Sequence, residues 1–155
     1  MKTLEKQQQV NQDVLVNGMN EFLADLQVFY QNLRGFHWNI KGAQFFVLHE
    51  KFEEYYTEVA ELVDEVAERI LTIGGEPVHA YSDYLRLASL PELKNVQDGR
   101  KAVGHIHEQY QTLLGKMRKL QAVAADSKDE GTQALYSEMI GETEKKLWML
   151  KAFLS

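Results

Sequence analysis

The sequence contains no cysteine. This absence excludes a disulfide framework, a thiolate metal site and a catalytic thiol, so any bound metal must be held by histidine, aspartate and glutamate. No run of about 18 apolar residues is present to span a membrane. The first residues, MKTLEKQQQV, lack the apolar segment of a signal peptide. We therefore expect a soluble, cytoplasmic protein without a membrane partner.

Proline and basic charge are scarce as well. The two prolines, Pro77 and Pro91, lie in one stretch, which leaves the remaining chain free of the strongest helix breaker. The formal net charge is −6, and no strongly basic footprint of a nucleic-acid-binding protein is present. With 155 residues, 45% of them hydrophobic, the chain is long enough to bury the core of one domain, 1–155.

Four long segments carry apolar residues at steps of three and four, the spacing of an amphipathic helix. Short links follow the first and third segments, which predicts two antiparallel hairpins. The middle link is long, begins with Gly74-Gly75 and includes a segment with helical spacing, Tyr81–Ala88. This pattern predicts an all-α, ferritin-like four-helix bundle with a short extra helix in the link between helices 2 and 3. We expect a flexible tail at 1–8 and long helices at 7–37, 44–73, 97–124 and 129–153.

The second expected helix is densely acidic. Between Glu50 and Glu68 there are eight carboxylates and a single cation, Lys51, which leaves a local charge of −7. A solvated helix face accounts for such a strip. A surface that collects cations accounts for it as well.

Four side chains of this helix are candidate metal ligands. At about 100° per residue, Glu53, Asp64 and Glu68 lie on the same side as His49, along the edge of the apolar stripe, and His37 ends the preceding helix nearby. His49 and Asp64 are 15 positions apart, about 22 Å along a helix, whereas metal–ligand bonds are about 2.0–2.2 Å long. The chain therefore has two half-sites, or the second pair comes from another copy, as a two-fold interface provides.

Two alternatives bear on these residues. A di-iron site inside the bundle requires Glu-x-x-His motifs on two helices, but the one such motif, Glu76 to His79, contains Pro77 and lies in the link. We therefore favour a site between subunits. Without a metal, the two histidines would make ordinary hydrogen bonds at helix ends, and the two later carboxylates would be a solvated i,i+4 pair.

A long motif runs through the middle of the chain: HWNIKG at 37–42, LHEKF at 48–52, DEVAER at 64–69 and IGG at 73–75, followed by LWMLKAFL at 147–154. These strings closely resemble the Dps family (DNA-binding protein from starved cells), the mini-ferritins. The resemblance covers nearly the whole chain, and the motif from 37 to 75 is too long for a chance match.

The resemblance implies a ferroxidase and iron-storage protein. Members of this family form a hollow homo-dodecamer of four-helix bundles, oxidise Fe(II) with hydrogen peroxide in preference to dioxygen, and store Fe(III) as a mineral inside. Their mono-iron or di-iron sites lie at two-fold interfaces. Carried over by position, the catalytic metal ligands are His37, His49 and Glu53 of one subunit and Asp64 and Glu68 of its two-fold mate.

The resemblance also suggests roles near the site and elsewhere in the shell. Trp38 matches a family tryptophan beside the iron site, although interface packing alone would explain it equally well. The family often has aspartate where this chain has Glu53. The longer side chain of glutamate changes the reach of the carboxylate and so affects occupancy of the second iron position. Glu50 and Glu54 are candidates for mineral nucleation or simply for a solvated face. Candidates for the iron-entry pore are Asp126, Asp129 and Glu130, with Ala134 where the family commonly has an acid.

A rival function is compaction of the nucleoid by direct DNA binding, which some members of the family perform. Such members use flexible tails rich in lysine and arginine, because neutralising phosphates supplies the affinity. Here the N-terminal segment holds Lys2 and Lys6 against Glu5, and a dodecamer would carry a formal charge of about −72. The sequence therefore favours iron storage over DNA binding. A structural bundle with a dead site is disfavoured, because every ligand position holds a competent residue.

Overall fold

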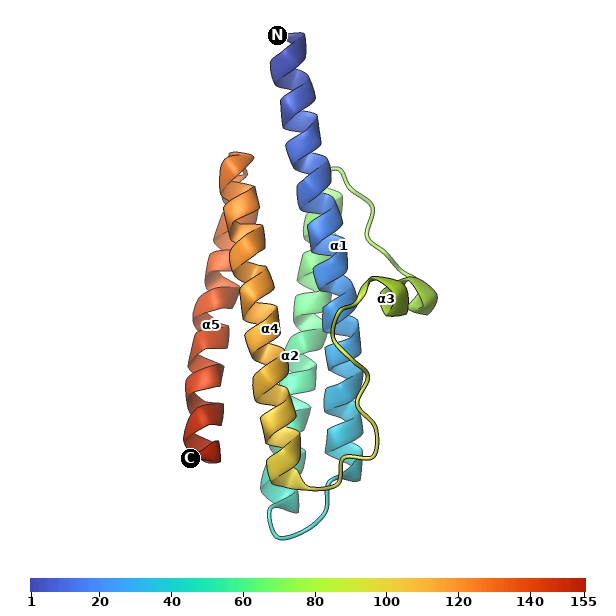
Figure 1. The fold of residues 1–155 in the computed structure, drawn as a ribbon, viewed down its shortest axis with the longest axis vertical. Helices are drawn as coiled ribbons and strands as arrows, with labels where there is room; N and C mark the ends of the chain where they lie inside the picture. Colours follow the sequence, from blue (N-terminus) through green and yellow to red (C-terminus); the bar gives the residue numbers. More distant parts are fainter.

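The computed structural model describes residues 1–155, and all of its regular secondary structure is helical (Figure 1). The predicted four-helix bundle and the extra helix in the long link are both confirmed. No helix combines the length and the continuous apolarity that crossing a lipid bilayer requires. The helices are α1 (Lys2–Asn39), α2 (Phe45–Thr72), α3 (Tyr81–Leu87), α4 (Gly99–Asp126) and α5 (Glu130–Leu154).

The bundle consists of two antiparallel hairpins. α1 packs along α2, α4 packs along α5, and the two hairpins meet where α1 packs against α4. Fully buried aromatic side chains fill the interior, among them Phe22, Phe29 and Tyr136. Phe22 meets the ring of Tyr136 edge-on at 5.5 Å, and Phe29 meets Tyr110 at 4.7 Å. Burial of each of the two phenylalanines stabilises the fold by about 1.5–3 kcal/mol relative to leaving it exposed.

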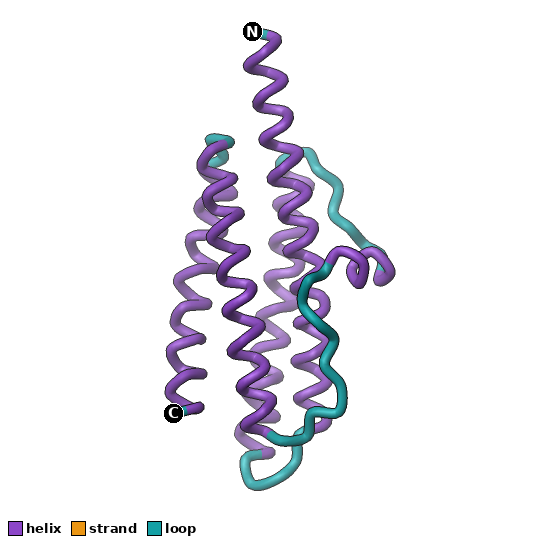
Figure 2. The backbone as a smooth tube through the Cα atoms, viewed as in Figure 1, coloured by secondary structure: helices purple, strands orange, loops and turns teal.

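α1 begins five residues before the expected start at position 7. Its first turns project beyond the other helices (Figure 2), and residues 1–10 are all exposed. The segment has too few apolar residues to show a periodic pattern, which is why the sequence predicted a later start. Lysine, glutamate, glutamine and leucine favour helix, and extending an existing helix avoids the cost of nucleation.

A row of polar side chains on α1 holds the long link in place. Asn20 accepts a hydrogen bond from the backbone N–H of Val78 (2.9 Å) and donates one to the carbonyl of Glu76 (3.0 Å). Asn32 accepts from the backbone N–H of Leu93 (3.0 Å) and donates to the carbonyl of Pro91 (2.9 Å). These contacts tie a link without strands to the bundle along its length (Figure 2).

Asp25 is the most deeply buried member of this row, with no exposed surface. Its carboxylate accepts hydrogen bonds from the backbone N–H groups of Ser89 (2.7 Å) and Leu90 (2.9 Å) and forms an ion pair with Lys116 of α4. A buried carboxylate is tolerated only when it is paired and hydrogen-bonded in this way. Asp25 therefore joins α1, the link and α4.

The two links that flank α2 each have a glycine in the left-handed region of backbone conformation. Gly42 has φ 106° in the turn between α1 and α2, and Gly74 has φ 88° just after α2. The N–H of Gly75 donates to the carbonyl of Ile70 at 2.8 Å, which closes the last turn of α2. The tight first turn brings the end of α1 back alongside the beginning of α2.

Candidate metal centre

Two histidines meet where α1 and α2 are joined. His37 lies in the last turn of α1 and is 7% exposed, and His49 lies in the second turn of α2. Nδ1 of His37 is 2.6 Å from the carbonyl oxygen of His49, and Nδ1 of His49 is 2.7 Å from the carbonyl oxygen of His37. The two rings stack with their centroids 3.7 Å apart and their planes within 11°. The sequence-based expectation that these residues lie close together is confirmed.

The reciprocal bonds determine which ring nitrogen can bind a metal. A carbonyl oxygen only accepts hydrogen bonds, so each Nδ1 must carry the proton and donate it. In the neutral imidazole, Nε2 then holds a free lone pair, which is the form that ligates metals. His37 and His49 therefore present two Nε2 donors from rings whose orientation each fixes for the other.

Aromatic neighbours hold this pair further. The ring of Phe45 stacks against His49 at 4.8 Å, and Tyr56 meets the ring of His37 edge-on at 5.3 Å. Glu53 lies one helical turn after His49 and is exposed. Residues four apart on a helix lie on one face, so Glu53 lies on the same face of α2 as His49.

The other two predicted ligands lie elsewhere in the chain. Asp64 and Glu68 are exposed on the last three turns of α2 and take part in no ion pair. The 15 positions between His49 and Asp64 lie within one unbroken helix, which separates them by about 22 Å. No three histidine, aspartate or glutamate side chains of the single chain gather into a cluster able to hold a metal. The chain thus presents two separate groups of donors: His37 of α1 with His49 and Glu53 near the start of α2, and Asp64 and Glu68 near its end.

Comparison with known proteins places this arrangement in a family. A family model described as a ferritin-like domain matches residues 16–155. A protein of Porphyromonas gingivalis named "DNA protection during starvation protein" is 43% identical over 148 residues, covering 96% of this chain and 92% of the relative. The chain belongs to the Dps family of ferritin-like proteins.

Solved structures agree with this membership. The Dps protein of Vibrio cholerae O1, described as a member of a broad superfamily of ferritin-like diiron-carboxylate proteins, is 44% identical with a TM-score of 0.93. The alignment covers 94% of this chain and 92% of that one. A Dps protein from Bacillus brevis is 36% identical with a TM-score of 0.92, over 94% of this chain and 98% of that one.

Large apolar side chains are exposed on the segments that carry the two histidines of this Dps chain. Trp38 is 54% exposed, and the Arg34 guanidinium lies 4.8 Å from its ring centroid and 5.3 Å from that of Tyr30. Phe46 and Val47, at the start of α2, are 83% and 69% exposed. Exposed apolar side chains of this size are candidates for contact with another subunit.

The acidic strip of α2 borders a groove of about 690 Å³ between α2 and α5. Its floor is apolar and includes Phe52 and Leu150, both buried, while glutamates of both helices line its sides. Burial and the nearby carboxylates of Glu138 and Glu142 raise the pKa of Glu65. The lining holds six glutamates and three lysines, so the groove carries a net negative charge.

Of the two residues predicted to nucleate mineral, one lines this groove and the other does not. Glu54 lines it and forms an ion pair with Lys51 at 2.6 Å, whereas Glu50 is exposed outside the lining. Glu58, which sequence analysis did not single out, also lines the groove and forms an ion pair with Lys146 of α5 at 2.8 Å.

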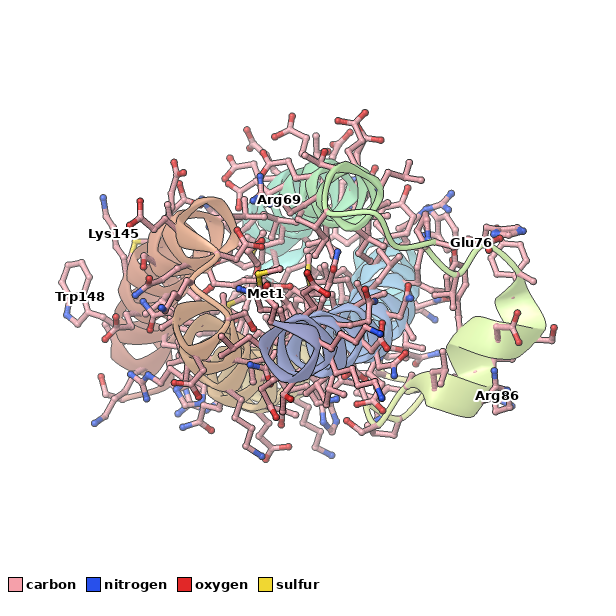
Figure 3. The ribbon with its side chains drawn as sticks, turned by 90° about the horizontal axis from the view of Figure 1, so that it is seen from above. Met1, Arg69, Glu76, Arg86, Lys145 and Trp148 are labelled. Atoms are coloured by element: carbon pink, nitrogen blue, oxygen red, sulfur yellow. The ribbon has the colours of Figure 1, made fainter.

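The three predicted pore residues lie around the turn between α4 and α5. Asp126 and Glu130 are exposed. Asp129 instead caps α5, accepting a hydrogen bond from the N–H of Thr132 (3.0 Å), and pairs with Arg69 of α2 at 2.8 Å. Burial by itself would raise the pKa of Asp129, but the hydrogen bonds of Thr132 and the Arg69 guanidinium lower it below its usual value. Figure 3 shows Arg69 in the view along the bundle from the end where the turn between α4 and α5 lies.

No sequence motif predicts a role for Arg69 or for Tyr56. Arg69 was noted only as part of the DEVAER string, and its partner Asp129 is 60 positions away, so no local pattern connects them. Tyr56 follows Glu53 by three positions and His49 by seven, and this helical spacing is the signal that could have placed it on the ligand face.

Proposed function

We propose that this chain oxidises Fe(II) and stores the Fe(III) product in a closed shell of about twelve copies, with each oxidation site shared by two subunits. The observation that carries the proposal is the pair of histidines whose Nδ1 protons are held by carbonyl oxygens, with Glu53 one helical turn after His49. Carboxylate and imidazole donors suit Fe(II). The site thus has part of its donors in place within one chain and draws the rest from another.

The rest of the donor set is supplied by an antiparallel approach of two α2 helices. In such a contact, the His49 end of one helix meets the Asp64 end of the other. Exposed apolar side chains stand near both ends of α2: Phe46 and Val47 near the histidines, and Leu71, 58% exposed, near Glu68. A two-fold axis would place Phe46 and Val47 of one subunit against Leu71 of the other, and the contact would bury these side chains. The same contact would complete two iron sites at once.

The oxidation follows from the electron count. Two Fe(II) ions each give one electron to hydrogen peroxide, which takes up two protons and leaves as two water molecules, so no hydroxyl radical is released. Glu53 keeps a carboxylate at the position where the family often has aspartate. Its extra methylene changes the reach toward the second iron, and sites holding one or two irons are both compatible with the donor set.

Storage and protection follow from the charge of the chain. Fe(III) hydrolyses and nucleates on carboxylates, and the groove between α2 and α5, with Glu54 on its side, supplies them. Asp126 and Glu130, exposed at the turn between α4 and α5, are the candidates for guiding iron into the shell. Consuming iron and peroxide protects DNA without binding it, which agrees with the net charge of −6 per chain.

The test is anaerobic titration of the Fe(II)-loaded protein with hydrogen peroxide. We expect two Fe(II) oxidised per peroxide and no radical adduct with a spin trap. His49→Ala should abolish the protein-dependent rate, whereas His79→Ala, an exposed histidine of the link, should retain it. A stoichiometry of one Fe(II) per peroxide with abundant radical adduct would refute the proposed chemistry.

A further inference from the structure

The groove between α2 and α5 has the size and the floor of a site for a small organic molecule. α2 packs along α1 and α5 packs along α4, whereas α2 and α5 do not pack closely against each other. The groove of about 690 Å³ between them has an apolar floor that includes Phe52, Val59 and Leu150, all of them buried. Small-molecule sites typically have volumes of about 300–1,000 Å³ and predominantly apolar linings. Such a floor can hold the hydrocarbon part of a ligand.

Two phenol hydroxyl groups in this groove have no hydrogen-bond partner in the chain. Tyr55 of α2 and Tyr110 of α4 both line the groove, and they are only 6% and 4% exposed. Their rings meet edge-on with centroids 5.9 Å apart. Burial and the charge of Glu58, which lines the same groove, raise the pKa of both phenols, to about 12 for Tyr55. Because a buried polar group without a partner is costly, a ligand that bonds to these hydroxyl groups gains affinity.

The sides of the groove carry carboxylates that no lysine or arginine neutralises. Lys51 and Lys146 are paired with Glu54 and Glu58, which leaves Lys145 as the third lysine of the lining. Four other glutamates of the lining form no ion pair, two of them one turn apart on α2 and two one turn apart on α5: Glu61, Glu65, Glu138 and Glu142. A cleft lined by carboxylates of this kind concentrates positively charged ligands.

We propose that this groove binds a linear polyamine, a ligand whose ammonium groups are separated by short methylene chains. The methylene chains lie on the apolar floor, and the ammonium groups donate hydrogen bonds to the unpaired carboxylates and to the phenol oxygens of Tyr55 and Tyr110. A bare metal ion would leave the apolar floor uncovered, and a neutral apolar molecule would leave the carboxylates without a partner. A hydrocarbon chain that carries amines matches both parts of the groove. This site goes beyond the proposed iron chemistry and does not depend on it.

The test is calorimetric titration of the assembled, iron-free protein with spermidine, and we expect saturable binding. Tyr110→Phe keeps the ring and removes the hydroxyl, so it should weaken binding about five-fold through the loss of one hydrogen bond. Glu65→Gln combined with Glu142→Gln keeps the shape of the groove and removes two charges, and we expect about ten-fold weaker binding or more. The matched control combines Glu21→Gln with Glu108→Gln, two exposed carboxylates outside the groove, and should stay within about two-fold of wild type because distant charges are screened.

Competition with Mg²⁺ separates an amine site from a general cation site. Mg²⁺ carries charge but no hydrocarbon chain, so it should displace spermidine only when it is present in large excess. Equal losses in the two double variants, wild-type affinity in Tyr110→Phe, or displacement by equimolar Mg²⁺ would each overturn the proposal. Failure of the wild type to oxidise Fe(II) would instead overturn the proposed function and leave this site in place, because the titration contains no iron.

Discussion

Mixing two inactive variants tests whether the iron site is shared between subunits. His49→Ala removes a ligand at one end of α2, and Asp64→Ala removes a ligand 15 positions away in the same unbroken helix. Since all subunits of a homo-oligomer carry the change, each variant alone damages every site. Both should nearly lose peroxide-driven Fe(II) oxidation.

Shells reassembled from equal amounts of the two variants should recover activity. In the proposed two-fold contact, each site would take His49 from one chain and Asp64 from the partner subunit. A site is whole only when its histidine half comes from the Asp64→Ala chain and its other half from the His49→Ala chain. Random mixing gives this combination at about one site in four, so about a quarter of the wild-type rate is expected.

The assay is stopped-flow absorbance of Fe(III) formation, with native mass spectrometry to verify the mixed shells. A matched control mixes His37→Ala with His49→Ala. Both changes fall in the same half-site, so no arrangement of these chains restores a whole site, and no activity should return. Verified mixed shells of the first pair that stay as inactive as their parents would refute the shared site.

Three further predictions concern stability and partners. Asp25→Ala should lower the free energy of unfolding by about 3 kcal/mol, because Lys116 and two backbone N–H groups lose their acceptor. The control, Glu21→Ala at an exposed position of the same helix, should change the urea midpoint little. Equal effects of the two variants would contradict a stabilising role of Asp25. The lowered pKa of Asp129 means that its stabilising contribution is present above the ordinary carboxyl pKa and is lost as the pH falls through the lowered pKa of the folded state. The stability difference between wild type and Asp129→Asn should therefore shrink on acidification. A constant difference from neutral to acid pH would refute this linkage. A gel-shift assay at physiological salt and neutral pH should show little DNA retardation, and tight binding that falls steeply with added salt would reveal a basic surface.

The sequence by itself determined the architecture and the separation between the two groups of candidate ligands. The helices follow from apolar residues at steps of three and four, with Pro77 and Pro91 confined to the link, and both features are local. The rise of a helix is constant, so positions alone show that His49 and Asp64 cannot share one ion within a chain. The approach of His37 to His49 was also predictable, because a short turn joins their helices.

Tertiary structure decided what depends on distant partners. The proton position on both imidazoles follows from carbonyl oxygens on the opposite helix, whose relative placement no local pattern encodes. Asp25 would be expected at the surface as a charged residue, and it is buried because the link supplies its N–H donors from more than 60 positions away. Likewise, the pairing of Arg69 with Asp129 exists only because the end of α2 meets the start of α5. Periodicity is a property of one helix, whereas hydrogen-bond partners are chosen by the packing of several.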